Sequence, residues 1–365
     1  MANTGSVVSG TDYNDVVDGV TAILGLGSGG DGYGQIVTSK ENAPTRGTTN
    51  LIDNNEWNTL RTDINKCSRH QSNADALSTE IPDNYIIGAD ASGPSVTRIT
   101  GDTFSIDTPN AAIGVNDWVN ALTQIQSQKN SIDANQRTLT TTRAFANSTR
   151  TTTWGGQFQG QSVYCEIRVI FGGGYECTNS AGTRVTASGA DHARHFFNSG
   201  GQIRLSQYLS GGTAKDSDWG TMLGNAGNAI FEANRTSGDG SANYRDGNTN
   251  VDGDIGGSIE SALGFYQLTT GYQLIAKKNG SQAEYAENYY TLYVKRNSAY
   301  DEITFKWEFH DIDTGDQTGI GPAVDESVLA SGGEMGVGID LLRATGSYVS
   351  VPEPTPDIVT ELRLT

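Results

Sequence analysis

The sequence is poor in the residues that most often build catalytic and metal sites. Only four histidines and three cysteines occur in 365 residues, and charged residues make up 18% of the chain. An odd number of cysteines argues against a disulfide framework and agrees with folding in a reducing cytoplasm. No stretch approaches about 18 consecutive apolar residues, so no membrane-spanning helix is expected. The opening residues, MANTGSVVSGTD, also lack the basic and apolar regions of a secretory signal.

Positive charge is the second shortage. Lysine and arginine together number 24 against 42 aspartates and glutamates, which gives a net charge of −18 and a pI of about 4.5. A surface of this sign repels a phosphate backbone, so no nucleic-acid partner is expected. With no apolar span, no membrane partner is expected either.

The residues that are abundant favour strands and turns. Glycine alone accounts for 46 residues, and serine, threonine, asparagine and glutamine make up much of the remainder. Threonine suits pleated surfaces, while glycine and asparagine adopt the positive φ angles of turns. The 15 tyrosines, 10 phenylalanines and 5 tryptophans supply enough apolar surface for a core, which argues against disorder.

Helical spacing is confined mainly to residues 1–140. Three apolar stripes predict three helices: Tyr13, Val16, Val17, Val20, Ile23 and Leu24; Trp57, Leu60, Ile64 and Cys67; and Trp118, Leu122 and Ile125. Asp53 and Glu56 have capping-box spacing at the start of the second helix. The third helix is expected to run from about Asn116 to Ile132. We interpret residues 1–140 as a helical and loop docking region whose exposed apolar faces pack against copies of themselves.

Residues 141–350 alternate between apolar and polar side chains, the pattern of half-buried strands. The clearest strand places apolar residues on one face, namely Ile303, Phe305, Trp307 and Phe309. The sequence therefore predicts an α+β fold, in which a mainly helical N-terminal region precedes an antiparallel, jelly-roll-like β-sandwich body over residues 141–350. Residues 351–365 carry three prolines within five residues, at 352, 354 and 356, and are expected to form an extended C-terminal arm.

Two cysteines in this body leave two alternatives open. Cys165 and Cys177 could face each other across a hairpin that turns at Gly172, Gly173 and Gly174. The other reading, two free thiols on or near a strand pair, is favoured by the reducing compartment.

Several patterns point towards chemistry, and each departs from its template. Gly25, Gly27 and Gly30 match GxGxxG, but that dinucleotide-binding motif needs a strand before it, and here a helix is predicted. His192 and His195 have a spacing that metal ligands use on a helix, yet no third ligand is evident, so a strand-entry or surface role is expected. Nothing distinguishes two of the many carboxylates as a glycosidase pair. We assign no catalytic residue and no cofactor site.

An acidic loop is the best metal candidate in the sequence. Asn248, Asn250, Asp252 and Asp254 run like positions 1, 3, 5 and 7 of a calcium-binding loop. The pattern then breaks, because Glu260 comes one residue later than the glutamate of the template. The two alternatives are a weak, structural Ca²⁺ site and a glycine-rich connecting loop.

Two segments resemble virion structural proteins of tailed bacteriophages, especially those that infect cyanobacteria. The first, from Asp12 to Gln71, resembles a helix, a glycine loop ending in GYGQ and a W-x-x-L-x-x-D-I helix ending near His-Gln. The matching residues are Gly32, Tyr33, Gly34, Gln35, Trp57, Leu60, Asp63, Ile64, His70 and Gln71. The second, HARHFFNSGGQIRLS from His192 to Ser206, is similar to an RYFFN-x-GG-x-IR segment of the same proteins, with His195 where tyrosine is common.

The resemblance implies assembly. Such a chain would be a non-enzymatic component of a tail, baseplate or neck, made in the host cytoplasm and located in the virion. Its partners would be other virion proteins and its own copies, as a symmetric homo-oligomer such as a trimer or hexamer. The alternative is a host-surface adhesin, a glycan-binding tail fibre or capsid-decoration domain, with residues 235–257 and Tyr244 as its binding loop. A polysaccharide-degrading enzyme is a third and more distant hypothesis. The position within the particle is open.

Overall fold

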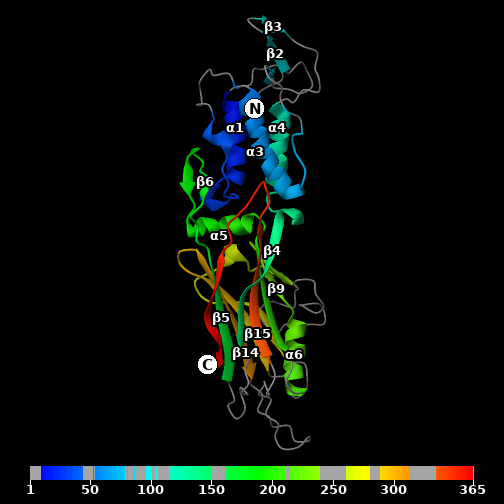
Figure 1. Ribbon diagram of the computed structural model, residues 1–365, viewed down its shortest axis with the longest axis vertical. Coiled ribbons are helices and arrows are strands. Elements are labelled where there is room, and N and C mark those ends of the chain that lie inside the picture. Colours follow the sequence, from blue (N-terminus) through cyan, green and yellow to red (C-terminus); the bar gives the residue numbers. More distant parts are fainter. Residues whose placement is uncertain are drawn as a thin grey trace, which may run out of the picture. The chain divides into compact units, whose positions relative to one another are not determined.

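A computed structural model supplies the structure of the chain (Figure 1). It describes residues 10–43, 52, 54–78, 80, 85–87, 96–100, 103–105, 115–148, 161–210, 214–238, 260–279, 288–311 and 334–364. The fold belongs to the α+β class, as predicted, with helices mostly in the N-terminal part and antiparallel sheets mostly in the C-terminal part. The jelly-roll connectivity stays a prediction.

The chain forms two compact units, each built from separate stretches of sequence. Unit 1 comprises residues 1–138, 173–200 and 343–352, and unit 2 comprises residues 139–172, 201–342 and 353–365. The helical first 138 residues are therefore joined in unit 1 by two short later segments.

Unit 1 contains helices and short strands. Its elements are α1 (Gly10–Leu24), η1 (Ser28–Gly30), α2 (Thr38–Glu41), α3 (Asn54–Ser72), β1 (Tyr85–Ile87), β2 (Val96–Thr100), β3 (Thr103–Ser105), α4 (Val115–Ser127), η2 (Ala134–Gln136), β6 (Glu176–Thr178), β7 (Arg184–Thr186) and α5 (Gly189–Asn198). Strands β1, β2 and β3 form one antiparallel sheet, and β6 pairs with β7 in a hairpin.

The three predicted apolar stripes form the core between α1, α3 and α4. Trp57 lies at its centre, with its ring centroid 5.0 Å from those of Tyr13 and Trp118. Gly19 of α1 lets α4 approach closely, because a Cβ there would lie 2.5 Å from a methyl carbon of Leu122. Since these stripes are buried against one another, and no described residue of the three helices is a large exposed hydrophobic, they are not available as docking faces for a second copy.

Unit 2 contains most of the long strands. Its elements are β4 (Arg137–Ser148), β5 (Gln161–Ile170), β8 (Gln202–Ser210), α6 (Ala214–Ala226), β9 (Ala229–Phe231), β10 (Thr236–Gly238), β11 (Glu260–Ser261), η3 (Phe265–Gln267), β12 (Gln273–Asn279), β13 (Tyr289–Arg296), β14 (Glu302–Asp311), β15 (Glu334–Ala344) and β16 (Thr355–Leu364). Six strands form one sheet in the order β11-β10-β9-β8-β15-β4, and five form the other in the order β12-β13-β14-β5-β16.

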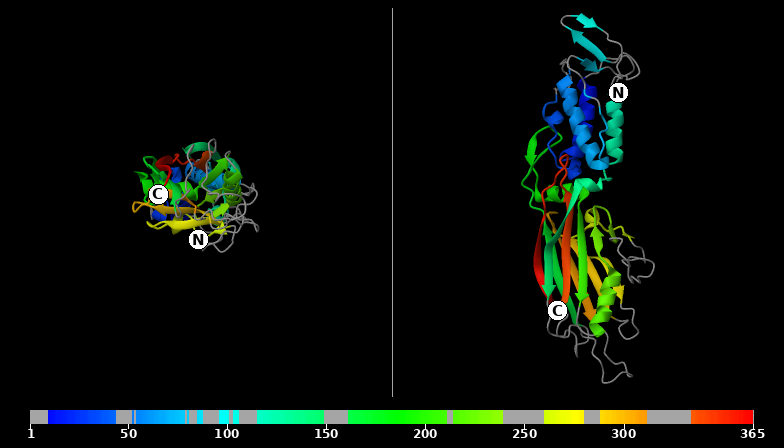
Figure 2. Two further views of the ribbon diagram at one scale, coloured as in Figure 1. Left: turned by 90° about the horizontal axis from the view of Figure 1, so that it is seen from below. Right: turned by 45° about the vertical axis from the view of Figure 1, so that its right-hand side comes forward.

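The two sheets of unit 2 face each other (Figure 2). Phe231 of β9 and Phe305 of β14 meet edge to face with their centroids 5.4 Å apart. Tyr290 of β13 donates a hydrogen bond of 3.0 Å to the side chain of Gln207 on β8. The apolar face predicted for β14 is buried, and β5 pairs with it in antiparallel register with Cys165 opposite Trp307.

The structure also bears on two other predictions, the C-terminal arm and the alternatives for Cys165 and Cys177. Residues 351–365, for which an extended arm was expected, contain β16, which pairs antiparallel with β5 of the same chain. Cys165 and Cys177 are both buried free thiols, which confirms the favoured alternative. They do not face each other across a hairpin, because β5 pairs with β14 and β16, while β6 pairs with β7. In the part of the chain that the structure describes, no helix is both long and apolar enough to span a bilayer.

Candidate functional site

The first of the two segments quoted for the phage resemblance meets the α5 part of the second, up to Gly200, in unit 1. The glycine loop after α1 turns back on that helix through backbone hydrogen bonds from Tyr33 to Ile23 (2.7 Å) and from Gln35 to Leu24 (2.8 Å). The turn needs glycine at Gly34, where φ is +72° and a Cβ would lie 2.2 Å from Nδ1 of His195. His195 belongs to α5, so the loop of the first segment touches the helix of the second.

Tyr33 of the glycine loop lies at the centre of a buried cluster of polar side chains. Its side chain is fully buried, and its hydroxyl donates to the backbone oxygen of Lys129 (2.7 Å). The same hydroxyl accepts a hydrogen bond of 3.0 Å from Nε2 of Gln71, which also donates to the backbone oxygen of Ile125. His70 packs edge-on against the Tyr33 ring at 5.0 Å. Burial raises the pKa of Tyr33 far above its usual value, so the phenol stays a hydrogen-bond donor.

Helix α5 brings the second segment against the loop. Ser188 and Asp191 form a capping box that starts the helix. Asn198 near its end donates to the backbone oxygens of Gly30 (3.2 Å) and Gly32 (3.3 Å). The residue that follows, Ser199, accepts a hydrogen bond at its backbone oxygen from Nε2 of His70, which ties α5 to α3. Residues distant in sequence are thus joined by polar contacts around one loop.

The two histidines of α5 use both ring nitrogens for structure. Nε2 of His195 donates to the backbone oxygen of Leu26 (3.3 Å), and its Nδ1 accepts from the hydroxyl of Tyr175 (2.6 Å). Nε2 of His192 donates to the backbone oxygen of Pro352 (2.9 Å), and its Nδ1 accepts from the backbone N–H of Gly173 (3.2 Å). Both rings are buried. The strand-entry or surface role expected for these residues is wrong, because the helix turns them into the core of unit 1.

The remaining motif predictions divide between the described and undescribed parts of the chain. The GxGxxG glycines follow α1 and lead into the short η1, so the strand and helix of a dinucleotide site do not flank them. The calcium candidates Asn248, Asn250, Asp252 and Asp254 lie outside the described residues, as does Tyr244. Among the residues that are described, no three His, Cys, Asp or Glu side chains are grouped as a metal site would need.

A second group of polar side chains lies on the outward face of the five-stranded sheet of unit 2. We call it the tyrosine–lysine face, defined by Tyr164, Tyr272, Tyr289, Tyr293, Lys277, Lys295 and Lys306. Each lysine stacks on a ring: Lys295 lies 4.2 Å from the centroid of Tyr272, Lys277 lies 4.3 Å from that of Tyr289, and Lys306 lies 5.1 Å from that of Tyr164. The rings and ammonium groups attract one another electrostatically.

Two carboxylates belong to this face, and both are held by neighbours. Glu166 accepts a 2.7 Å hydrogen bond from the hydroxyl of Tyr272. Glu308 accepts from His310 (3.1 Å) and pairs with Lys306. The hydrogen bond from His310, assisted by Lys306 and opposed by burial, lowers the pKa of Glu308 to about 2. Glu308 is therefore ionised at neutral pH and acts as an acceptor of hydrogen bonds rather than as a proton donor.

Sequence reasoning missed the tyrosine–lysine face. The alternating tyrosines at 289 and 293 were visible in the sequence, but they acquire neighbours only through the strand order β12-β13-β14-β5. That order joins segments separated by more than a hundred residues, which periodicity along the chain does not reveal.

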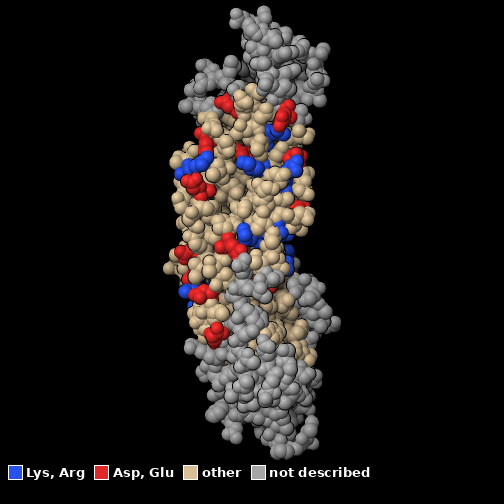
Figure 3. Space-filling view, in the orientation of Figure 1, with Lys and Arg blue, Asp and Glu red and all other residues tan. Residues whose placement is uncertain are grey.

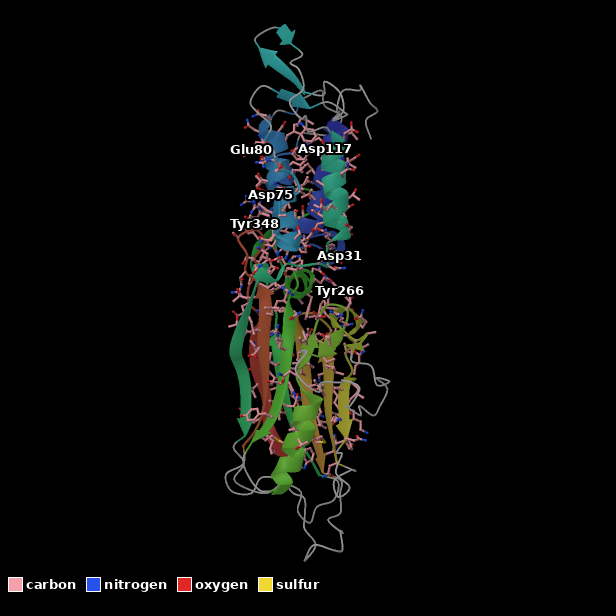
Figure 4. The ribbon with its side chains drawn as sticks, turned by 90° about the vertical axis from the view of Figure 1, so that its right-hand side faces the viewer. Asp31, Asp75, Glu80, Asp117, Tyr266 and Tyr348 are labelled. Carbon is pink, nitrogen blue, oxygen red and sulfur yellow. The ribbon has the colours of Figure 1, made fainter. Side chains whose placement is uncertain are left out.

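Elsewhere the charged side chains are mixed in sign. Acidic and basic groups lie side by side on the visible face, with broad uncharged areas between them (Figure 3). Asp75 and Glu80 lie beside α3, with Tyr348 near its C-terminal end (Figure 4). Asp75 is paired with Arg69 through two contacts of 2.5 and 2.6 Å, and Glu80 is paired with Arg61 at 2.7 Å. Exposed pairs of this kind contribute about 0–1 kcal/mol each and do not define a site.

Comparison with known proteins adds no relative, since no protein-family model, curated protein or solved structure matches this chain.

Replacing Gly34 by alanine tests the contact between the loop and α5. Gly29 provides a matched control, because its φ of +67° is similar and nothing lies within 4 Å of a Cβ there. We expect Gly29→Ala to cost about 1 kcal/mol, the usual penalty for a left-handed backbone. Gly34→Ala should cost at least about 2 kcal/mol more, because the methyl group displaces the buried His195 ring. Urea unfolding of both variants measures the difference, and equal costs would contradict the packing described.

The buried histidines predict a loss of stability in mild acid. Burial lowers the pKa of His70 and of His195 to about 4. The unfolded chain takes up these protons near pH 6.5, so between these values it binds more protons than the folded chain. Their contribution is therefore complete above about pH 6.5 and is lost as the pH falls towards 4. We expect a loss of about 1.5 kcal/mol per histidine between pH 6.5 and 5.

Urea unfolding monitored by tryptophan fluorescence at pH 5.0, 5.5, 6.0 and 6.5 measures this slope. Burial also lowers the pKa of His192, so the variant His195→Gln removes one of several titrating groups, and its unfolding free energy should depend less steeply on pH than that of the wild type. An unchanged slope would show that His195 is not held neutral in the folded chain.

Proposed function

We propose that the chain is a non-enzymatic structural component of a tailed-phage particle, in the tail, baseplate or neck, and that it works through contacts with its own copies and with neighbouring virion proteins. One observation carries the proposal. The two segments that resemble phage virion proteins, though separated by more than a hundred residues, fold against each other around Tyr33 and His195. If the resembling phage proteins have the same fold, this contact explains why both segments occur in one chain.

The use of the polar residues in these segments supports the same reading. Gln71, His70 and Asn198 bond backbone oxygens, and both nitrogens of His192 and His195 are occupied. Side chains committed to internal hydrogen bonds hold loops and helices in place. These polar residues of the two segments therefore have a structural role in unit 1, which suits a particle protein that must remain folded for long periods.

Particle location and assembly together test the proposal. An antibody raised against the full chain should label one fixed position on particles of the phage that encodes it, in electron micrographs. The purified full chain should sediment as a symmetric oligomer at micromolar concentration. Particles that carry no label, together with a chain that stays monomeric, would contradict the proposal.

The tyrosine–lysine face favours a second candidate function, the binding of a cell-surface glycan. Aromatic rings next to oriented carboxylates and ammonium groups offer both stacking surfaces and hydrogen-bond partners to a sugar. Tyr293 and Tyr272 lie 6.4 Å apart between centroids on this face, and both side chains are partly exposed.

Glycan binding by the full chain, measured on an array of bacterial surface polysaccharides, tests the second candidate. Tyr293→Ala should weaken any binding at this face by roughly tenfold, since one aromatic contact is lost. Tyr300→Ala changes an exposed tyrosine at the β13–β14 turn, outside the face, and should leave binding unchanged. Equal effects of the two substitutions, or no binding by the wild type, would count against a glycan site here.

A further inference from the structure

The open edges of the two sheets of unit 2 differ in how well they are protected. Among the described strands, the edges are β11 and β4 in the six-stranded sheet and β12 and β16 in the five-stranded sheet. An edge strand presents unpaired backbone N–H and C=O groups that another strand can pair with. Soluble proteins limit this by short strands, prolines, charged residues or bulges along the edge.

Three of the four edges carry such protection. β11 has only two residues. β12 has a register shift between Leu274 and Ala276, followed by Lys277 and Lys278. β16 contains Pro356 and Asp357, and its register shifts twice, after Ile358 and after Thr360. Each of these edges resists the addition of a further strand.

β4 is long and has no proline, and its only charged residues are Arg137 and Arg143. It has 12 residues, RTLTTTRAFANS, with no proline, lysine, aspartate or glutamate. Four of the residues are threonine, and one is phenylalanine, both of which favour strands. Leu139 near its beginning is 37% exposed, which makes it one of few large apolar side chains open to solvent among the described residues. A long edge strand with no acidic residue, no proline and few charges can pair with a strand of another chain.

We propose that β4 is the self-assembly edge of this protein, and that it pairs antiparallel with β4 of a second copy across a two-fold axis. The inference rests on the self-association in the proposed function and assigns it to a surface. A second copy is the occupant that fits, because two identical edges related by a two-fold axis satisfy each other's backbone groups at once. The two six-stranded sheets then form one continuous sheet.

The sequence of β4 favours one register for this pairing. A two-fold axis at Thr142 places Leu139 opposite Phe145 of the second copy, and Thr140 opposite Ala144. It also places Arg143 opposite Thr141 rather than opposite Arg143, so that like charges are not directly paired. Cross-strand apolar pairs stabilise a sheet, and opposed like charges destabilise it. Thr142 would then face Thr142 of the second copy.

Disulfide trapping tests both the edge and the register. The native cysteines Cys67, Cys165 and Cys177 are fully buried, so an introduced thiol on an edge is the accessible one. Under mild oxidation of the full chain, Thr142→Cys should give a disulfide-linked dimer on a non-reducing gel, because directly opposed strand residues lie within bonding distance. Val359→Cys places a thiol on the protected β16 edge, at a side chain that is 47% exposed, and should remain monomeric on the gel.

Charge placed on the edge provides a second, independent measurement. The double variant Leu139→Lys, Thr141→Lys should raise the dissociation constant of the assembly at least about tenfold in sedimentation equilibrium, since the lysine at position 141 then opposes Arg143 of the second copy and the one at position 139 removes the apolar partner of Phe145. Val359→Lys is the matched control and should leave the dissociation constant unchanged. Circular dichroism melting checks that each variant is folded.

The outcomes separate this inference from the proposed function. If the full chain assembles but the double lysine variant assembles equally well and Thr142→Cys gives no linked dimer, the β4 edge is overturned and self-association stands. If Thr140→Cys or Ala144→Cys is linked in place of Thr142→Cys, the Thr142-centred register is overturned. A wild-type chain that remains monomeric at micromolar concentration overturns the β4 edge, and the proposed function fails with it only if the particles also carry no label.

Discussion

The structure of unit 1 depends on one buried constraint, the hydrogen bonds of the Tyr33 phenol inside a glycine-rich loop. A buried hydroxyl that loses its partners carries a desolvation cost of about 1–3 kcal/mol, so the loop, α3 and the end of α4 must all be in place to satisfy it. Tyr33 bonds Gln71 of α3 and the backbone oxygen of Lys129 just after α4. The loop can reach this position only because glycines permit its positive φ angles and leave room for His195.

The histidines extend the same constraint to α5. His195 and His192 are held neutral by burial, with one nitrogen donating and the other accepting. Such residues combine features that a sequence reader associates with metal sites, namely close spacing and a helical setting. Their contacts show a different use: each imidazole donates one hydrogen bond and accepts another, and so joins α5 to two loops.

In unit 2 the strands are specified by the alternation of apolar and polar residues. Its edge strands differ in their length, prolines, charged residues and register shifts. The inward faces of β5 and β14 pair apolar residues directly, as Trp307 with Cys165 and Phe305 with Ile167. The outward residues of the same strands build the tyrosine–lysine face. Its lysines contact tyrosine rings as well as carboxylates, so the face combines cation–π and ionic contacts. These basic groups gather there although the net charge of the chain is −18.

Local pattern was enough to predict the α+β class, the three apolar helical stripes and the buried face of β14. These features follow from periods of 3.6 and 2 residues, which a single segment displays by itself. The end of α4 at Ser127 rather than near Ile132, and the pairing of β16 within the chain, were not visible, because helix ends and strand partners depend on distant neighbours.

The candidate sites, too, were predicted from the sequence only in part. The sequence by itself determined which residues are scarce, which segments are helical or extended, and that Gly34 and His195 stand in motifs resembling phage virion proteins. Only the tertiary structure decided that these two residues touch, that His192 and His195 are buried hydrogen-bonding groups, and that four tyrosines share one sheet face. The physical reason is that such contacts join residues far apart in sequence, and they arise from the packing of whole elements rather than from any local preference.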